Sequence, residues 1–121
     1  MKQEDKELLL KDLCARLPYG VKVQYNNEIY NIDYISALYE EVKLDIPDRY
    51  TVGISEIKPY FHSMENMTEK EKIDFRAFFN YDGVEYPDEY IDWLNTHHFD
   101  YRGLIKKGLA IEAPKDIYLT K

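Results

Sequence analysis

Three histidines and one aspartate are the residues best suited to chemistry: His62, and His97, His98 and Asp100 in the stretch HHFD. Imidazole and carboxylate groups can bind a metal or transfer protons. Neighbouring residues point about 100° apart on a helix and to opposite faces on a strand, so His97 and His98 are poorly placed to share one metal. The spacing matches neither H-x-x-x-H nor C-x-x-C. We therefore expect packing or capping roles for the histidines, with neither a metal nor a cofactor.

Other reactive residue types lack the context that catalysis needs. Ser36, Ser55 and Ser63 are not in a G-x-S-x-G turn, and the five glycines are too scattered to form a phosphate-binding loop. The acidic run over residues 82–92 does not match the ligand spacing of a calcium loop. Cys14 falls on an apolar helical stripe, which predicts a small buried side chain rather than a reactive thiol. We expect no catalytic residues.

The elements that would position these side chains begin with a helix over residues 3–16. Its apolar positions recur at helical spacing and Pro18 ends it; the stripe comprises Leu10, Leu13, Cys14 and Leu17. Alternating apolar residues then predict short strands at 21–25, 30–34, 42–46 and 50–54. Asn26-Asn27 and Pro47-Asp48 are the expected turns between them. Residues 55–61 are expected to leave the sheet in an extended conformation through Pro59.

Helix signals dominate the second half of the chain. Thr68 and Glu71 form a capping box, which predicts a helix over about 69–80 that ends at Tyr81-Asp82-Gly83. We expect its inner face to comprise Ile73, Ala77 and Phe78. Pro87 and the acids after it are typical of a helix first turn, and a turn at 97–100 leads to a second short helix that ends at Gly108. The sequence thus predicts a helical hairpin over 88–108, followed by a strand at 109–111.

These elements predict one α+β domain over residues 1–121. It would consist of an N-terminal helix, a small antiparallel sheet that could curl into an SH3-like barrel, and the C-terminal helical hairpin. The chain has 121 residues, of which 45% are hydrophobic and 32% charged, so it is long and apolar enough to form a core without metal or disulfide cross-links.

Charge and cysteine content restrict partners and compartment. The net charge is −7, and the acid is concentrated in residues 18–100, whereas residues 101–121 are basic. This balance argues against direct nucleic-acid binding, and the acids of the first hairpin helix argue against a DNA-reading helix–turn–helix. We find no signal peptide and no membrane-spanning run, and a single cysteine agrees with a reducing compartment. We expect a cytoplasmic protein that does not bind membranes.

Tyrosine is the most unusual feature of the composition, at 12 of 121 residues. Tyrosine suits half-buried strands, and it is also enriched at protein interfaces. A candidate interaction surface therefore combines strand tyrosines with residues of the hairpin, including its basic member. The candidate residues are Tyr25, Tyr30, Tyr34, Tyr60, Trp93, His97, His98 and Arg102.

Three blocks of the sequence carry a resemblance: DKELLLKDLCARLPYGV, EIKPYFHSMENMTEKEK and DWLNTHHFDYRGLIKKGLA. They resemble a family of short proteins from prophages and mobile elements of gut anaerobes, over nearly the whole chain. The resemblance implies a mobile-element setting and no assigned activity, cofactor or site residue.

Three functional hypotheses follow. The first is a non-catalytic interaction or accessory protein that binds an unknown protein partner, because chemical motifs are missing beside a high aromatic content. The alternative is an acidic mimic of nucleic acid, or an inhibitor of a host defence protein, because residues 18–100 are strongly acidic. The third is an enzyme, which would require two or more of His62, His97, His98 and Asp100 to meet in a concave pocket. The oligomeric state stays open.

Overall fold

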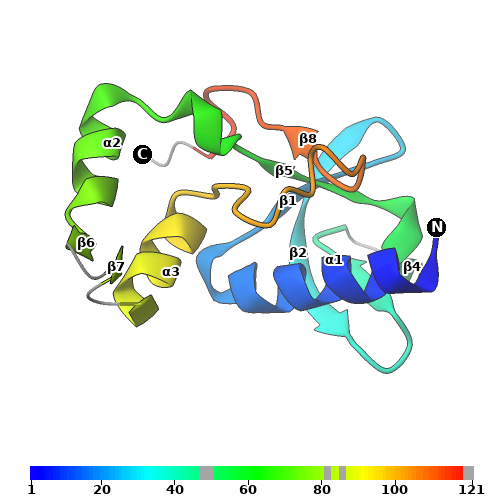
Figure 1. Cartoon of the computed structure of the whole chain (residues 1–121). Helices are drawn as coiled ribbons and strands as arrows, with labels where there is room; N and C mark the ends of the chain where they lie inside the picture. Colours follow the sequence, from blue (N-terminus) through cyan, green and yellow to red (C-terminus); the bar gives the residue numbers. More distant parts are fainter. Residues whose placement is uncertain (47–50, 81–82, 85–86, 119–121) are drawn as a thin grey trace.

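A computed structural model describes residues 1–46, 51–80, 83–84 and 87–118 (Figure 1). Its longer elements, in chain order, are α1 (Gln3–Arg16), β1 (Lys22–Tyr25), β2 (Glu28–Ser36), β3 (Glu41–Leu44), β4 (Thr51–Gly53), β5 (Lys58–Phe61), α2 (Glu69–Arg76), β6 (Phe79–Asn80), β7 (Gly83–Val84), α3 (Pro87–Thr96) and β8 (Ile111–Glu112). The predicted α+β class is confirmed, with the helix first, the main sheet next and two helices toward the C-terminus. The expected turns at Pro47-Asp48 and Tyr81-Asp82 lie outside the described residues.

The main sheet has the strand order β4-β3-β2-β1-β5-β8. Neighbouring strands are antiparallel except for β5 and β8, which run parallel. The described strands leave β4 and β8 at opposite edges, so the sheet is open rather than closed into an SH3-like barrel. Residues 58–61, expected to leave the sheet, instead form β5 inside it, between β1 and β8.

The β1–β2 hairpin turns at the two asparagines that the sequence predicted. Asn26 and Asn27 have φ angles of 50° and 64°. Positive φ at both central residues is the geometry of a type I′ turn, whose twist matches that of the flanking strands. Asparagine tolerates this conformation better than most residues with a side chain, so it fixes the register in which Tyr25 pairs with Glu28.

Helix α1 packs its inner face on the sheet, and that face matches the predicted one except at Cys14 and by the addition of Leu9, Asp12 and Arg16. The buried residues of α1 are Leu9, Asp12, Leu13 and Arg16. Leu9 and Leu13 join a core formed with Val23, Val42, Leu44, Phe61 and other apolar residues. The prediction for Cys14 is wrong, because its side chain is exposed. Leu10 and Leu17 of the predicted stripe are partly buried against the core, and a buried ion pair between Asp12 and Arg16 completes the inner face.

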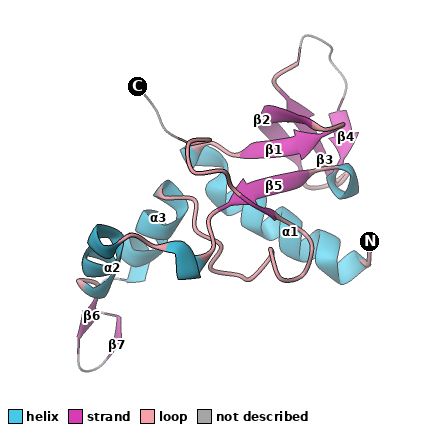
Figure 2. Ribbon diagram, turned by 90° about the horizontal axis from the view of Figure 1, so that it is seen from above, coloured by secondary structure: helices cyan, strands magenta, loops and turns pink. Residues whose placement is uncertain are grey.

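Helices α2 and α3 lie apart from the main sheet, together with the β6–β7 hairpin (Figure 2). The capping box of α2 is confirmed: the Thr68 hydroxyl accepts from the Glu71 N–H at 3.1 Å, and the Glu71 carboxylate accepts from the Thr68 N–H at 2.8 Å. The helix ends at Arg76, before the predicted 80. Two inner-face predictions are wrong, because Ile73 is 65% exposed and Ala77 is also exposed.

An aromatic cluster joins α2 to α3 instead of an aliphatic face. The Phe75 ring lies 5.4 Å from that of Tyr90 and 5.9 Å from that of Trp93, and the Phe78 ring packs against the same two rings. Trp93 in turn stacks on Phe99 at 5.7 Å. Because Phe99 is itself buried, this stack connects the α2–α3 unit to the rest of the molecule.

The second helix predicted for the hairpin over 88–108 does not form, so this prediction is wrong. Helix α3 begins at Pro87 as predicted, but residues 101–109 form consecutive turns. The Asp100 carboxylate accepts from the backbone N–H groups of Leu104 and Ile105 at 2.8 and 2.9 Å, and so fixes the start of these turns. Within the described residues, no helix has both the length and the apolar composition required to cross a membrane.

Candidate functional site

All three histidines of the chain line one cavity of about 580 Å³, here called the histidine pocket. A cavity of this size is within the range of ligand-binding pockets. Apart from His62, His97 and His98, its lining includes the aromatic residues Phe99 and Tyr118 and the charged residues Glu71, Glu112, Lys115 and Asp116. The pocket thus lies where the end of β5, the end of α3 and the segment after β8 meet.

A short parallel bridge brings the histidines together from distant parts of the sequence. The backbone N–H of His62 donates to the His98 carbonyl at 2.8 Å, and the N–H of Asp100 donates to the His62 carbonyl at 2.8 Å. His62 and Phe99 are thereby paired in an isolated parallel β-bridge. This pairing extends the line of β5 by one residue and places the HHFD stretch beside it, which no local sequence pattern indicates.

His97 is held in one tautomer by its own helix. Its Nδ1 lies 2.9 Å from the carbonyl oxygen of Trp93, one turn earlier in α3. A carbonyl only accepts, so Nδ1 carries the proton and Nε2 is the accepting nitrogen of the neutral ring. The ring stacks on the Trp93 indole with a centroid separation of 4.3 Å. His97 therefore presents a fixed, half-buried imidazole to the pocket.

His62 lies opposite a fixed carboxylate. Its Nδ1 is 3.9 Å from Oε2 of Glu112, too long for a hydrogen bond and within the range of an ion pair. Glu112 is oriented by the Ser63 N–H at 3.1 Å and by the Asn66 side-chain amide at 3.0 Å. The pair is partly exposed to water, so its attraction is weak in the absence of a ligand.

His98 is the strained and buried member of the three. It is 9% exposed, has a φ of 60°, and its Nδ1 is buried without a hydrogen-bond partner among the described residues. Its ring stacks on that of Tyr118 with a centroid separation of 3.5 Å and an interplanar angle of 10°. Burial, followed by the nearby charge of Arg16, lowers the pKa of His98 from 6.5 to about 4, so this imidazole is neutral at pH 7.

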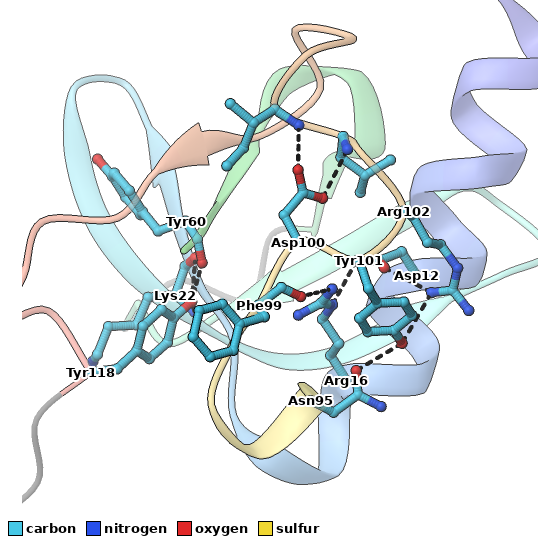
Figure 3. Close-up of polar contacts among 12 residues, drawn as sticks. Asp12, Arg16, Lys22, Tyr60, Asn95, Phe99, Asp100, Tyr101, Arg102 and Tyr118 are labelled. Carbon is cyan, nitrogen blue, oxygen red and sulfur yellow. Dashed lines mark hydrogen bonds and ion pairs between the residues drawn. The ribbon is translucent and has the colours of Figure 1, made fainter. Parts of the chain in front are cut away.

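Tyr118 connects the C-terminal segment to two strands of the sheet. Its hydroxyl accepts from the backbone N–H of Lys22 at 3.0 Å and donates to the carbonyl of Tyr60 at 2.6 Å (Figure 3). Burial raises the pKa of Tyr118 to about 12. The phenol is therefore protonated over the physiological range and can keep both hydrogen bonds.

Arg102 makes its described polar and cation–π contacts within the protein. Its guanidinium donates to Asp12 at 2.7 Å and lies over the Tyr101 ring (Figure 3). Arg16 donates to the other oxygen of Asp12 at 2.8 Å and to the Phe99 carbonyl at 2.6 Å. These contacts anchor the backbone of the HHFD stretch to α1. Arg16 and Arg102 therefore help to hold in place the part of the chain that lines the pocket.

The tyrosines expected at an interaction surface differ in their exposure to solvent. Tyr60 is 7% exposed and belongs to the interior. Tyr25 and Tyr30 are half-buried and pack on each other across the β1–β2 hairpin at 6.3 Å. Tyr34 is exposed. Of the candidate surface residues, His97 and His98 line the histidine pocket, and Trp93 stacks on His97.

The pocket contains the histidines but not Asp100, whose carboxylate is fully used in capping the turns after it. Over the described ranges, no group of three or more histidine, cysteine, aspartate or glutamate side chains is placed to hold a metal ion. The arrangement can offer two half-exposed imidazoles, aromatic faces and carboxylates to a bound group. It can accept protons and hydrogen bonds, and it can attract positive charge.

Two of the pocket residues, Glu112 and Tyr118, are not indicated by any sequence pattern. Both come from the last part of the chain, where a single tyrosine and a single glutamate carry no spacing signal. Comparisons of the chain with models of protein families, with curated proteins and with solved structures gave no match. The functional argument therefore depends on the histidine pocket.

Proposed function

We propose that this chain is a non-catalytic interaction protein that takes a segment of a protein partner into the histidine pocket. The observation that carries the proposal is the convergence of all three histidines and two aromatic rings on one cavity of about 580 Å³. A cavity of that size accepts a few side chains rather than a whole domain. Trp93 stacks on His97 and so supports an imidazole that a bound segment would contact.

The charge of the pocket favours a basic segment. Its described lining has three carboxylates, Glu71, Glu112 and Asp116, against one lysine, Lys115. Arginine or lysine in the partner would pair with Glu112, which backbone and amide groups already hold in place. The aromatic rings would cover the apolar stem of the same side chain. The resemblance to prophage proteins agrees with an accessory role, and we further propose a cytoplasmic location, supported by the single cysteine.

An enzyme is the second candidate, because two half-exposed imidazoles share the pocket. His97 has an accepting Nε2 when neutral, and His62 faces Glu112. Such a pair can move protons, but the described lining supplies no serine or cysteine nucleophile. Binding therefore has the stronger support.

An acidic mimic of nucleic acid is the third candidate. Several carboxylates of residues 18–100 accept hydrogen bonds from side chains of the same chain: Glu28 from Tyr30, Asp45 from Asn31 and Asp92 from Tyr19. These acids lie on separate elements and have partners within the chain. Local structure thus accounts for part of the acid content that motivated the mimic.

Imidazole NMR tests the binding proposal. Every imidazole signal reports on the pocket, because all three histidines of the chain line it. The probes are capped peptides that contain arginine beside tyrosine, and matched peptides with glutamate in place of arginine. We expect the arginine peptides to shift the ¹⁵N and ¹H signals of His62 and His97, and the glutamate peptides to leave them unchanged. Loss of one charge-assisted hydrogen bond in Glu112→Gln should weaken binding about tenfold.

The control is Glu89→Gln, which removes an exposed carboxylate of α3 that does not line the pocket. Equal weakening by both substitutions would replace the pocket proposal with general attraction to an acidic surface. Hydrolysis of the peptides during the titration would favour the enzyme instead.

A further inference from the structure

The stacked pair of His98 and Tyr118 is a wall between two hollows. On one side lies the histidine pocket, and on the other a smaller cavity of about 280 Å³. The smaller cavity is lined by Tyr19, Lys22, Asn31 and Ile117, together with His98 and Tyr118. Both residues of the pair thus line both hollows.

The segment that carries Tyr118 is held mainly through that one side chain. The backbone bond of Ala113 to the Phe61 carbonyl, at 2.7 Å, is the last described backbone contact between this segment and the sheet. Beyond it, Pro114, Lys115 and Asp116 are exposed, and the Ile117 N–H bonds back to Pro114 within the segment. Residues 114–118, here called the strap, therefore depend on the Tyr118 side chain: on its hydroxyl, on its stack with His98 and on its edge contact with the His62 ring.

The surroundings of His98 oppose a positive charge on its ring while the strap is closed. Arg16 of α1, Lys22 of β1, His62 after β5 and His97 after α3 each contribute positive or potentially positive charge. Tyr118 covers the ring with a protonated phenol, which supplies no compensating anion. The buried Nδ1 has no hydrogen-bond partner among the described residues, so a proton on this nitrogen would have no acceptor. A protonated His98 would need water, and the strap excludes water from it.

We propose that the strap is a latch that protonation of His98 releases, and that its release joins the two hollows into one longer binding groove. The advantage of a longer groove for a partner segment rests on the proposed function, whereas the latch itself does not. In the closed state the pKa of His98 is about 4, and in water it is 6.5. The open state therefore binds the extra proton between these values, and acid shifts the equilibrium toward it.

The direction and size of the pH effect on the ratio of open to closed strap follow from the binding of one proton to His98. Above pH 6.5 the imidazole is neutral in both states and the latch is closed to its full extent. As the pH falls from 6.5 to 4, the ratio of open to closed strap rises by up to about tenfold per pH unit. Below about pH 4 the ratio no longer changes through this group.

The Lys22 amide reports the latch directly, because its hydrogen-bond acceptor is the Tyr118 hydroxyl. We expect its protection against hydrogen exchange, corrected for the intrinsic pH dependence, to fall between pH 7 and pH 5. The amide of Ile32, bonded to Val21 in the same sheet, should keep its protection and serves as the internal control. Constant protection at Lys22 would overturn the proposal.

Two variants at His98 separate the charge from the stack. His98→Phe keeps a ring for Tyr118 and cannot be protonated, so Lys22 protection should no longer depend on pH. His98→Asn tolerates the positive φ and loses the stack, so Lys22 should be weakly protected at both pH values. A pH-dependent loss in His98→Phe as large as in the wild type would overturn the role of His98.

A third measurement holds even where a variant at His98 fails to fold. Tyr118→Ala removes the cover from the ring, so the pKa of His98, followed by imidazole NMR, should rise from about 4 toward 6.5. An unchanged pKa would overturn the latch. These measurements use the protein without any peptide, so they test the latch separately from the proposed function. Failure of the arginine peptides to bind would contradict the proposed function and would not change the result for the latch.

Discussion

Asp12 and Arg16 occupy inner positions of α1 that apolar residues usually hold, and both side chains are completely buried. Arg16 contacts Asp12, the Phe99 carbonyl and the face of the Phe61 ring. Breaking a buried pair by neutralising one member leaves the other charge uncompensated, which is more costly than the pair is stabilising. These residues therefore decide whether the HHFD stretch stays attached to α1.

Replacement of the buried carboxylate tests this role. Asp12→Asn preserves shape but leaves Arg16 without a counterion, and we expect the free energy of unfolding to fall by about 3 kcal/mol. Urea denaturation followed by circular dichroism measures it. The matched control is Glu7→Gln, an exposed acid on the same helix, which should change stability by less than about 0.5 kcal/mol. Equal stability of Asp12→Asn and the wild type would contradict the argument.

At the same scale, the sequence indicates which residue types could take part in chemistry, but not which of these residues meet in the folded chain. His62, His97 and His98 were singled out, and the structure places them in one pocket. Their convergence depends on the backbone pairing of His62 with the HHFD stretch, which joins residues about 35 positions apart. Cys14 was misplaced because a helical wheel cannot distinguish an apolar stripe from a face whose polar members pair with each other.

At the scale of elements, the β1–β2 turn shows how local geometry limits substitution. Asn27 has a φ of 64°, a conformation that glycine adopts without steric cost and alanine does not. We expect Asn27→Gly to stabilise the chain by about 0.5 kcal/mol and Asn27→Ala to destabilise it by about 1 kcal/mol. Thermal and urea unfolding of the two variants provide the comparison. Indistinguishable stabilities would contradict the assignment of a type I′ turn.

Elements with a local physical signal were predictable from the sequence. The capping box of α2, the Pro87 start of α3 and the paired asparagines act within a few residues, and each is present in the structure. The helix expected after Tyr101 does not form, because the Asp100 carboxylate captures the N–H groups of Leu104 and Ile105 in a tight turn. The inner face of α2 was misassigned because its partner is the aromatic face of α3, which the pattern within α2 does not show.

At the scale of the whole molecule, the aromatic cluster and the main core should unfold together. The connection is Trp93, which stacks on Phe99, while Arg16 of α1 holds the Phe99 carbonyl. Trp93 is the single tryptophan of the chain, so its fluorescence reports the cluster alone. We expect its urea transition to coincide with that of far-UV circular dichroism. Two separate midpoints would contradict the prediction that residues 1–121 form one domain.

The long reach of the Tyr118 contacts has a consequence for the order of events during protein synthesis. The hydroxyl of Tyr118 binds Lys22, a residue 96 positions earlier in the chain. The hairpin of β1 and β2 can form while translation continues, since its contacts are local. The wall of the histidine pocket can be completed only after residue 118 has left the ribosome. A nascent chain that has not yet reached Tyr118 can therefore hold the β1–β2 hairpin but only an unfinished pocket.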